Sequence, residues 1–152
     1  MGNRASVIRP YPLLKKYMVG VLQALHIGVA EEDVLAPEST VEDIVGFLQK
    51  HPNEFSLLLL PYYPRNDREQ NLLHGLEILR RIQQEVPEYR HVKKIMPINA
   101  IGRMTYQQEA KAYQAELADP NLLVLDEEEI SDDRQALLNK ISRFLGVPAA
   151  AA

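Results

Sequence analysis

The chain has 152 residues, of which 46% are hydrophobic and 25% charged, with a formal net charge of −4. This balance predicts one soluble globular domain, and the acidic charge disfavours a nucleic-acid-binding surface. The absence of cysteine excludes disulfides, thiolate metal sites and cysteine nucleophiles. No apolar run approaches the roughly 20 residues that span a bilayer, and residues 1–9 lack the apolar core of a secretory signal, so we expect no membrane insertion and a cytoplasmic protein.

The first part of the chain predicts two strand–helix pairs and a central strand. Residues 6–8 form a short strand, and the prolines that follow begin a helix that runs to about His26. A weaker strand is expected at 33–36, and Ser39-Thr-Val-Glu42 is a capping box for a helix at 40–50. Residues 55–60 are apolar at nearly every position, which is typical of a central parallel strand covered on both faces.

The second part of the chain adds two strands and three helices. Apolar positions three and four residues apart predict a helix that ends near Pro87, and residues 94–99 form the next strand. A capping box at Thr105 opens a helix that runs through Leu117. A strand at 121–125 and a helix capped by Ser131 and ended by Gly146 complete the chain.

This alternation defines the expected fold class. Five strand–helix pairs predict a single α/β domain over residues 1–146, with 147–152 as a tail or linker. Right-handed crossovers favour one doubly wound, five-stranded parallel sheet in the flavodoxin-like order 2-1-3-4-5. In such sheets ligands and chemistry lie at the carboxyl ends of the strands, so the loops after these strands are the places to look for function.

Within that arrangement the chain resembles the receiver domain of bacterial response regulators over roughly residues 6–146. The segments that carry the resemblance are 11–16, 50–60, Pro64 with 75–82, 98–100 and 130–138. The first is similar to the start of the family's first helix, and the second to the approach to its central strand. The departure that stands out is the stretch from Pro64 to Gly75, which is longer than the family usually has.

The resemblance implies a functional pocket whose residues are missing here. Receivers phosphorylate an aspartate at the end of the third strand, hold Mg²⁺ with an acidic pair, and hold the phosphoryl oxygens with a threonine or serine and a lysine. The residues at these positions are Arg9, Pro10, Leu60, Asn99 and Glu128, or for the last a neighbour within 126–129. Leucine has no carboxylate, arginine repels Mg²⁺, and glutamate repels phosphate. The chain is therefore interpreted as a degenerate pseudo-receiver, with no catalytic residue, no cofactor and no metal.

Two groups of aromatic residues are candidate partner-binding sites. Tyr62 and Tyr63, held between prolines after the central strand, either fill the space of the lost pocket or form a hydrophobic docking spot. Tyr106, Ala110 and Tyr113 share one stripe of the helix expected at 105–117. That stripe either faces a partner or packs on the sheet, and the sequence leaves both alternatives open.

Other polar groups have a surface interpretation beside a functional one. The acidic run 126–129 is a cation site or a solvated loop, and Asp67 is a relocated phosphoacceptor or part of a polar surface loop. The basic pairs at 80–81 and 93–94 are expected on the solvated surface. The four histidines show no spacing typical of metal ligands.

The function we expect is a non-enzymatic, phosphorylation-independent module for protein–protein interaction and signalling. Its partner would be another protein or a second copy of the chain, and neither nucleic acid nor membrane. The alternative is a flavodoxin-like domain that binds a small ligand, or an enzyme that acts, at the carboxyl edge of the sheet.

Overall fold

A computed structural model of the chain describes residues 5–7, 20–27, 41–60, 74–98, 106–107, 110–126 and 133–146. Its strands are β1 (Ala5–Val7), β2 (Leu57–Leu59), β3 (Lys93–Ile98) and β4 (Leu122–Asp126). Its helices are α2 (Val41–Lys50), α3 (His74–Glu85), η3 (Pro87–Tyr89), η4 (Ala110–Tyr113), α5 (Gln114–Leu117) and α7 (Arg134–Leu145), besides a helical segment at 20–24. In these ranges no helix combines the length and the apolar character that crossing a bilayer requires.

The four strands form one parallel sheet in the order β1-β2-β3-β4. The predicted α/β class and parallel sheet are confirmed, and the four strands neighbour one another as the expected order requires. The further edge strand expected at 33–36 lies outside the described residues. Pairing of β3 with β2 ends at Leu59 and Ile95, whereas its pairing with β4 continues to Ile98 and Asp126. Pro97 explains the difference, because it has no N–H to donate to a longer β2.

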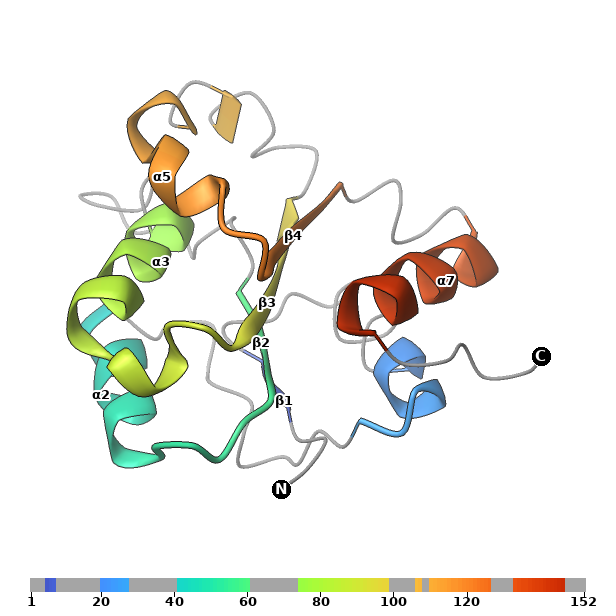
Figure 1. Ribbon diagram of the computed structural model, residues 1–152, viewed down its shortest axis with the longest axis horizontal. Coiled ribbons are helices and arrows are strands. Elements are labelled where there is room, and N and C mark those ends of the chain that lie inside the picture. The colour runs from blue at the N-terminus through green and yellow to red at the C-terminus, as the bar shows by residue number, and fades with distance from the viewer. Residues whose placement is uncertain are drawn as a thin grey trace.

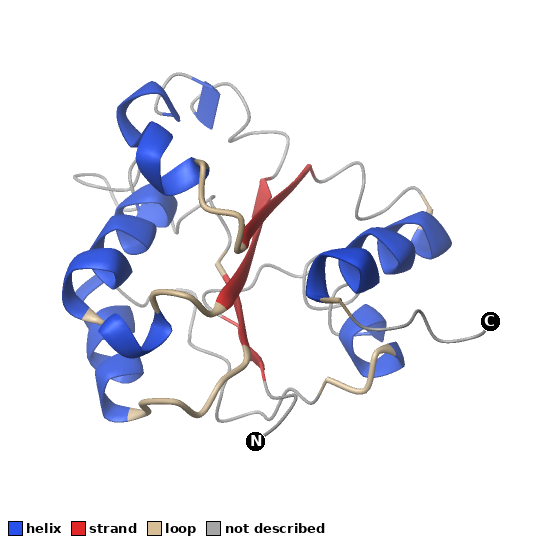
Figure 2. Cartoon of the chain, in the orientation of Figure 1, coloured by secondary structure: helices blue, strands red, loops and turns tan. Residues whose placement is uncertain are grey.

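Helices lie on both faces of the sheet (Figures 1 and 2). The helices α2, α3 and α5 cover one face, and α7 with the segment 20–27 covers the other. Each face has its own hydrophobic cluster, and side chains of β2 alternate between the two: Leu58 belongs to the first, Leu57 and Leu59 to the second. This alternation follows from the two-residue period of a strand.

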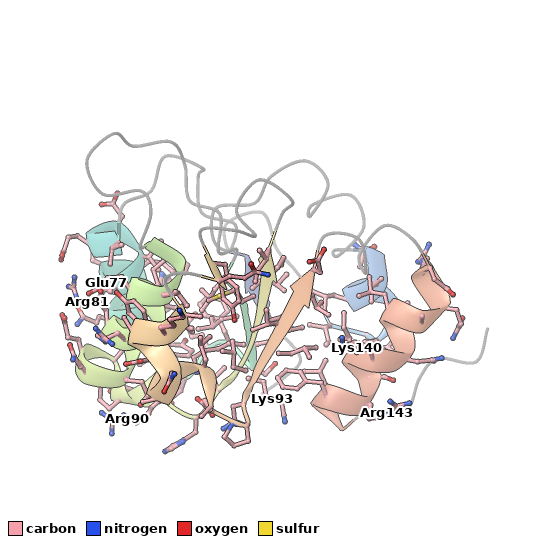
Figure 3. All side chains as sticks on the ribbon, turned by 90° about the horizontal axis from the view of Figure 1, so that it is seen from above. Glu77, Arg81, Arg90, Lys93, Lys140 and Arg143 are labelled. Carbon is pink, nitrogen blue, oxygen red and sulfur yellow. The ribbon has the colours of Figure 1, made fainter. Side chains whose placement is uncertain are left out.

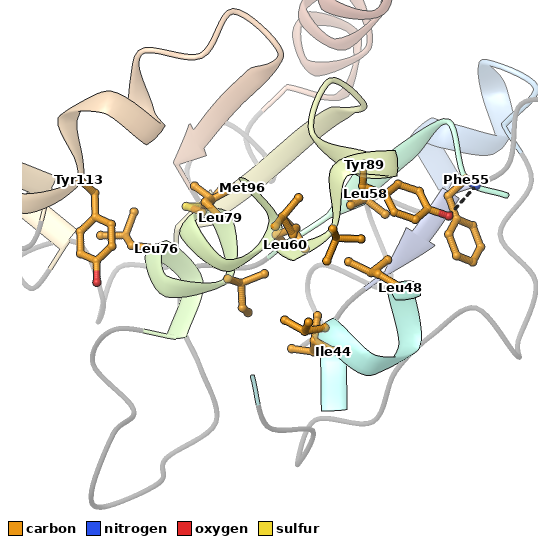
Figure 4. Packing of buried hydrophobic residues seen from close by; sticks show 14 of the residues in the cluster. Ile44, Leu48, Phe55, Leu58, Leu60, Leu76, Leu79, Tyr89, Met96 and Tyr113 are labelled. Atoms are coloured by element: carbon orange, nitrogen blue, oxygen red, sulfur yellow. Dashed lines mark hydrogen bonds between the residues drawn. The ribbon is translucent and has the colours of Figure 1, made fainter. Parts of the chain in front are cut away.

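The strand β2 is the centre of the molecule, as the sequence predicts. Leu58, Leu59 and Leu60 are each 0% exposed, and Phe55 is buried at the entry to the strand. Figure 4 shows the first cluster, in which Phe55, Leu58 and Leu60 pack with residues of α2 and α3, whereas Leu59 belongs to the second cluster. At about 1.5–3 kcal/mol for each fully buried aliphatic side chain, this strand contributes a large part of the folding free energy.

The last helix differs from its predicted start. Asp133, and not Ser131, is the N-cap of α7, and its Oδ1 accepts hydrogen bonds from the N–H groups of Gln135 (3.0 Å) and Ala136 (3.1 Å). The end is as predicted, because Gly146 takes a left-handed conformation with φ of 72° that glycine adopts without strain. The helix therefore spans twelve residues, with Leu137, Leu138 and Ile141 facing the sheet.

Candidate functional site

The carboxyl ends of the strands are the expected place for a functional site. Among the described residues this edge is formed by Leu60 after β2, Ile98 at the end of β3 and Asp126 at the end of β4. Leu60 extends the ladder by donating its N–H to the carbonyl of Ile95 at 2.9 Å. Leu60 therefore lies directly after the central strand, at the position that the family resemblance assigns to the phosphoacceptor.

The described residues around Leu60 are apolar. Its side chain is completely buried in the first cluster, which also contains Leu76, Met96 and Ile98 (Figure 4). None of these side chains offers an oxygen to a metal ion or a nucleophile to a phosphoryl group. The end of the central strand is therefore part of the core, with no chemical group for phosphoryl transfer at Leu60 itself.

The other predicted residues of this edge lie outside the described residues. They are Arg9, Pro10, Tyr62, Tyr63, Asn99 and Glu128. Of the acidic run 126–129, only Asp126 is among the described residues, and it is half-buried. Asp67 also falls outside. The described part of the chain contains no group of three or more histidine, aspartate or glutamate side chains placed to hold a metal ion.

The stripe of Tyr106, Ala110 and Tyr113, expected on the helix at 105–117, is buried at Tyr113. This side chain is 4% exposed and belongs to the first cluster, while Tyr106 is half-buried against the same cluster. Burial raises the pKa of the Tyr106 hydroxyl. The expected continuous helix is also wrong, since the chain forms the 3₁₀ turn η4 and then the short helix α5, with a break at Tyr113 (φ −124°, ψ 31°). Ala110, at the start of η4, is half-buried.

Polar contacts hold Tyr113 in place. Its hydroxyl donates to Glu77 Oε1 at 3.1 Å, and the guanidinium of Arg80 lies 4.1 Å from the centre of its ring. Arg80 also donates to both carboxylate oxygens of Glu116 and to the carbonyl of Ala112. These bonds tie η4 and α5 to α3, so the role of this region is to complete the core.

The basic pair at 80–81 is partly exposed, as expected, and is engaged in ion pairs. Arg81 donates to Glu42 on α2 at 2.7 and 3.1 Å and to Glu85 one turn along α3. The hydrogen bond and the charge of Arg81 lower the pKa of Glu42, and in the same way Arg80 lowers the pKa of Glu116. Arg81 thereby joins α2 to α3, and Arg80 joins α3 to α5.

The second basic pair divides between surface and core, which the sequence did not predict. Lys93 is half-buried, with its ammonium 4.9 Å from the centre of the Phe144 ring. Lys94 is 2% exposed, and its ammonium donates to the carbonyls of Arg90 (3.3 Å) and Val92 (2.7 Å). Desolvation lowers the pKa of Lys94 to about 8, against a smaller raising effect of Asp119.

A buried tyrosine was also missed by the sequence interpretation. Tyr89 is 0% exposed, and its hydroxyl accepts from the N–H groups of Glu54 (3.1 Å) and Phe55 (3.4 Å) while donating to the carbonyl of His51. Its ring stacks on Phe55. This side chain fixes the turn that leads from α2 into β2. The only signal in the sequence is that Tyr89 follows Pro87, in a segment without hydrophobic periodicity.

A cavity of about 480 Å³ lies at the opposite, amino edge of the sheet. Its lining residues are Gln83, His91, Ala115, Glu116, Asp119, Pro120 and Asn121. Both of its carboxylates have partners already, because Glu116 binds Arg80 and Asp119 accepts from the N–H of Asn121 at 2.8 Å. Both carboxylates are therefore engaged in contacts within the domain.

Comparison with known proteins agrees with this architecture. The chain is similar to the selenomethionine derivative of the REC domain of AraT, a response regulator from Geobacillus stearothermophilus, with a TM-score of 0.52. The similarity covers 94% of this chain and 98% of that one, at 13% sequence identity. No protein-family model matches the chain, and no curated protein matches it in sequence.

At this identity the likeness concerns the fold alone. The chain has a receiver-like α/β fold, which confirms the coarse part of the family resemblance. The two domains are nearly the same length in structure, since the similarity covers almost all of both. What the fold does in this chain depends on the residues described above.

Proposed function

We propose that this chain is a receiver-like protein-interaction module that works without phosphorylation and is not an enzyme. The observation that carries the proposal is Leu60, a completely buried leucine at the end of the central strand. Phosphorylation of a receiver needs a carboxylate at this position, and leucine has no atom that can form an acyl phosphate. The function of the module would therefore depend on its surface and not on a switch in this pocket.

The remaining pocket positions support the same proposal through their chemistry. Arg9 and Pro10 stand where the resemblance expects an acidic pair, and Mg²⁺ requires oxygen ligands of the kind that neither supplies. Asn99 occupies the position of the threonine or serine, and Glu128 occupies the position of the lysine. A glutamate would add negative charge where phosphoryl oxygens need a cation. Four of these five positions, those of Arg9, Pro10, Leu60 and Glu128, therefore lack the chemistry that phosphorylation uses.

The first test is chemical. The protein is incubated with acetyl phosphate and Mg²⁺ and its intact mass is measured, beside a receiver that retains the aspartate as the positive control. We expect the control to gain a phosphoryl group and this chain to gain none. An adduct would contradict the proposal, and an Asp67→Asn variant would then show whether that side chain is the acceptor.

The second test concerns interaction. Tagged protein, treated and untreated with acetyl phosphate, is used to capture partners for identification by mass spectrometry. The proposal expects the same partner in both samples, in the same amount. Thermal unfolding against a panel of nucleotides and metabolites tests the alternative, because a ligand that binds the folded state raises the melting temperature. A reproducible rise with a small molecule would favour a ligand-binding domain.

A further inference from the structure

The segment 110–117 folds against its own local preference. Its sequence, Ala-Lys-Ala-Tyr-Gln-Ala-Glu-Leu, consists mainly of strong helix formers and contains neither glycine nor proline. The structure nevertheless divides it into the 3₁₀ turn η4 and the short helix α5, and the backbone of Tyr113 between them is not helical (φ −124°, ψ 31°). A 3₁₀ stretch in a sequence that favours an α-helix often marks a hinge, and a tertiary contact must account for the break.

Arg80 on α3 supplies that contact. In a continuous α-helix the carbonyl of Ala112 would accept from the N–H of Glu116, four residues later. Here α5 begins only at Gln114, and this carbonyl accepts from Arg80 Nη2 at 2.9 Å. The carboxylate of Glu116 accepts from the same guanidinium at 3.0 and 3.4 Å and also from its own backbone N–H. Both groups of the helical hydrogen bond therefore have other partners.

Arg80 also contacts the residue at the break itself. Its guanidinium lies 4.1 Å from the centre of the Tyr113 ring, whose hydroxyl donates to Glu77. Figure 3 shows α5 beside α3, on which Glu77 is labelled. The side chain of Arg80 is 34% exposed and that of Glu116 is 14% exposed, so their charge-assisted hydrogen bonds are partly shielded from solvent. Arg80 thus contacts three successive parts of the segment, before, at and after the break.

The break also shapes the outer surface of the segment. A groove of about 360 Å³ lies across η4 and α5, lined by Ala110, Lys111, Gln114, Leu117 and Ala118. In a continuous α-helix the residues at 110, 114, 117 and 118 would form one convex stripe, because positions three and four apart lie on the same face. The groove therefore depends on the broken backbone.

We propose that the segment 110–117 is a two-state element and that Arg80 is the latch that holds it in the broken state. When Arg80 is withdrawn, the carbonyl of Ala112 bonds to the N–H of Glu116 and the segment becomes one α-helix. The groove on its outer face is then replaced by a continuous stripe, so a partner that binds one form better shifts the balance between the two. This inference goes beyond the proposed function, because it concerns a conformational change within the domain and not phosphorylation.

The test is NMR of the whole chain, which reports on each residue of the segment separately. In Arg80→Ala the chemical shifts of the Cα carbons at 112–114 should move toward α-helical values. Hydrogen exchange at the amide of Glu116 should slow roughly five- to tenfold, because this N–H gains the helical hydrogen bond. If Arg80 only tied the segment to the core, its removal would move the shifts toward random-coil values and speed the exchange. That result, or values equal to those of the parent, would overturn the inference.

Two further variants make the comparison specific. Arg80→Lys keeps a positive charge near the Tyr113 ring but lacks the planar fork that reaches the carbonyl and the carboxylate together, so it should change the segment in the same direction. Arg81→Ala is the matched control, because its partners among the described residues lie on α2 and on α3 itself. Its shifts at 112–116 should equal those of the parent, and an equal gain of helix in this control would refute the specific role of Arg80.

A second substitution tests the helix itself. Ala112→Gly lowers the helix preference of the segment, so Arg80→Ala combined with Ala112→Gly should lose the helical shifts and the slow exchange that Arg80→Ala alone gains. Helical shifts that persist in the double variant would contradict completion of the helix at this residue. Melting temperatures establish that each variant is folded, and Arg80→Lys provides the test if Arg80→Ala does not fold. None of these measurements involves acetyl phosphate, so failure of this inference and failure of the proposed function are distinguishable.

Discussion

Replacing Lys94 with methionine should remove a measurable pH dependence from the stability of this domain. The ammonium is buried, and desolvation lowers its pKa from 10.5 to about 8 in the folded state. Between these two values the unfolded chain binds more protons than the folded one. The free energy of unfolding therefore rises with pH across this window.

The magnitude follows from the difference between the two pKa values. At about 1.4 kcal/mol per pH unit, a charged Lys94 costs the fold about 3 kcal/mol below pH 8, and the cost disappears above about pH 10.5. Between pH 7.5 and 9.5 the parent should gain about 2 kcal/mol relative to Lys94→Met. The absolute stability of Lys94→Met is less informative than its pH dependence, because this variant also loses the hydrogen bonds to the carbonyls of Arg90 and Val92.

The assay is urea unfolding of three proteins at both pH values. Lys93→Met is the matched control, since it removes a lysine from the neighbouring position, where the side chain is only half-buried. We expect the parent and the control to gain stability in parallel and Lys94→Met to lack that gain. Equal pH dependence in all three proteins would refute the burial of a charged Lys94 as the cause.

Three further predictions concern the core and its turns. Leu58→Asp and Leu59→Asp should each abolish cooperative unfolding in circular dichroism, because burying an unpaired carboxylate costs several kcal/mol of a total of about 5–15 kcal/mol; a folded variant of either would show that the core lies elsewhere. Tyr89→Phe keeps the ring but removes the hydroxyl that accepts from the N–H groups of residues 54 and 55, so chemical denaturation should show a loss of about 1–3 kcal/mol, and an unchanged midpoint would contradict the role of this hydroxyl. Asp133→Ala should cost about 1 kcal/mol by loss of the α7 cap, and a neutral result would move the cap elsewhere.

The sequence predicts best those elements in which the spacing of the apolar residues shows which side chains are buried. The helix expected at 40–50 is α2, because its apolar residues three and four apart form one face against the sheet. The run at 55–60 contains the buried strand β2, which is shorter than expected at Leu57–Leu59 and is buried because both of its faces are covered. The start of α7 was placed two residues early, since Ser131, Asp132 and Asp133 are all good caps and their spacing favours none of them.

The site was harder to predict because tertiary contacts decide the role of its residues. A tyrosine stripe has the same spacing whether it faces a partner or the core, and only the packing of η4 against α3 buries Tyr113. Two adjacent lysines look alike in sequence, but the alternation of β3 sends Lys93 toward α7 and Lys94 under the turn at 90–92. Neither outcome follows from local pattern alone.

The position of Leu60 links the fold to the proposed function. A phosphorylated carboxylate must be hydrated and must have oxygen ligands and cations around it, whereas a leucine at the same point gains about 1.5–3 kcal/mol by complete burial. The same residue therefore stabilises the sheet and, in the proposed function, takes the position of the nucleophile. If the carboxyl end of the central strand serves stability, the proposed interaction function would use surfaces that burial leaves open.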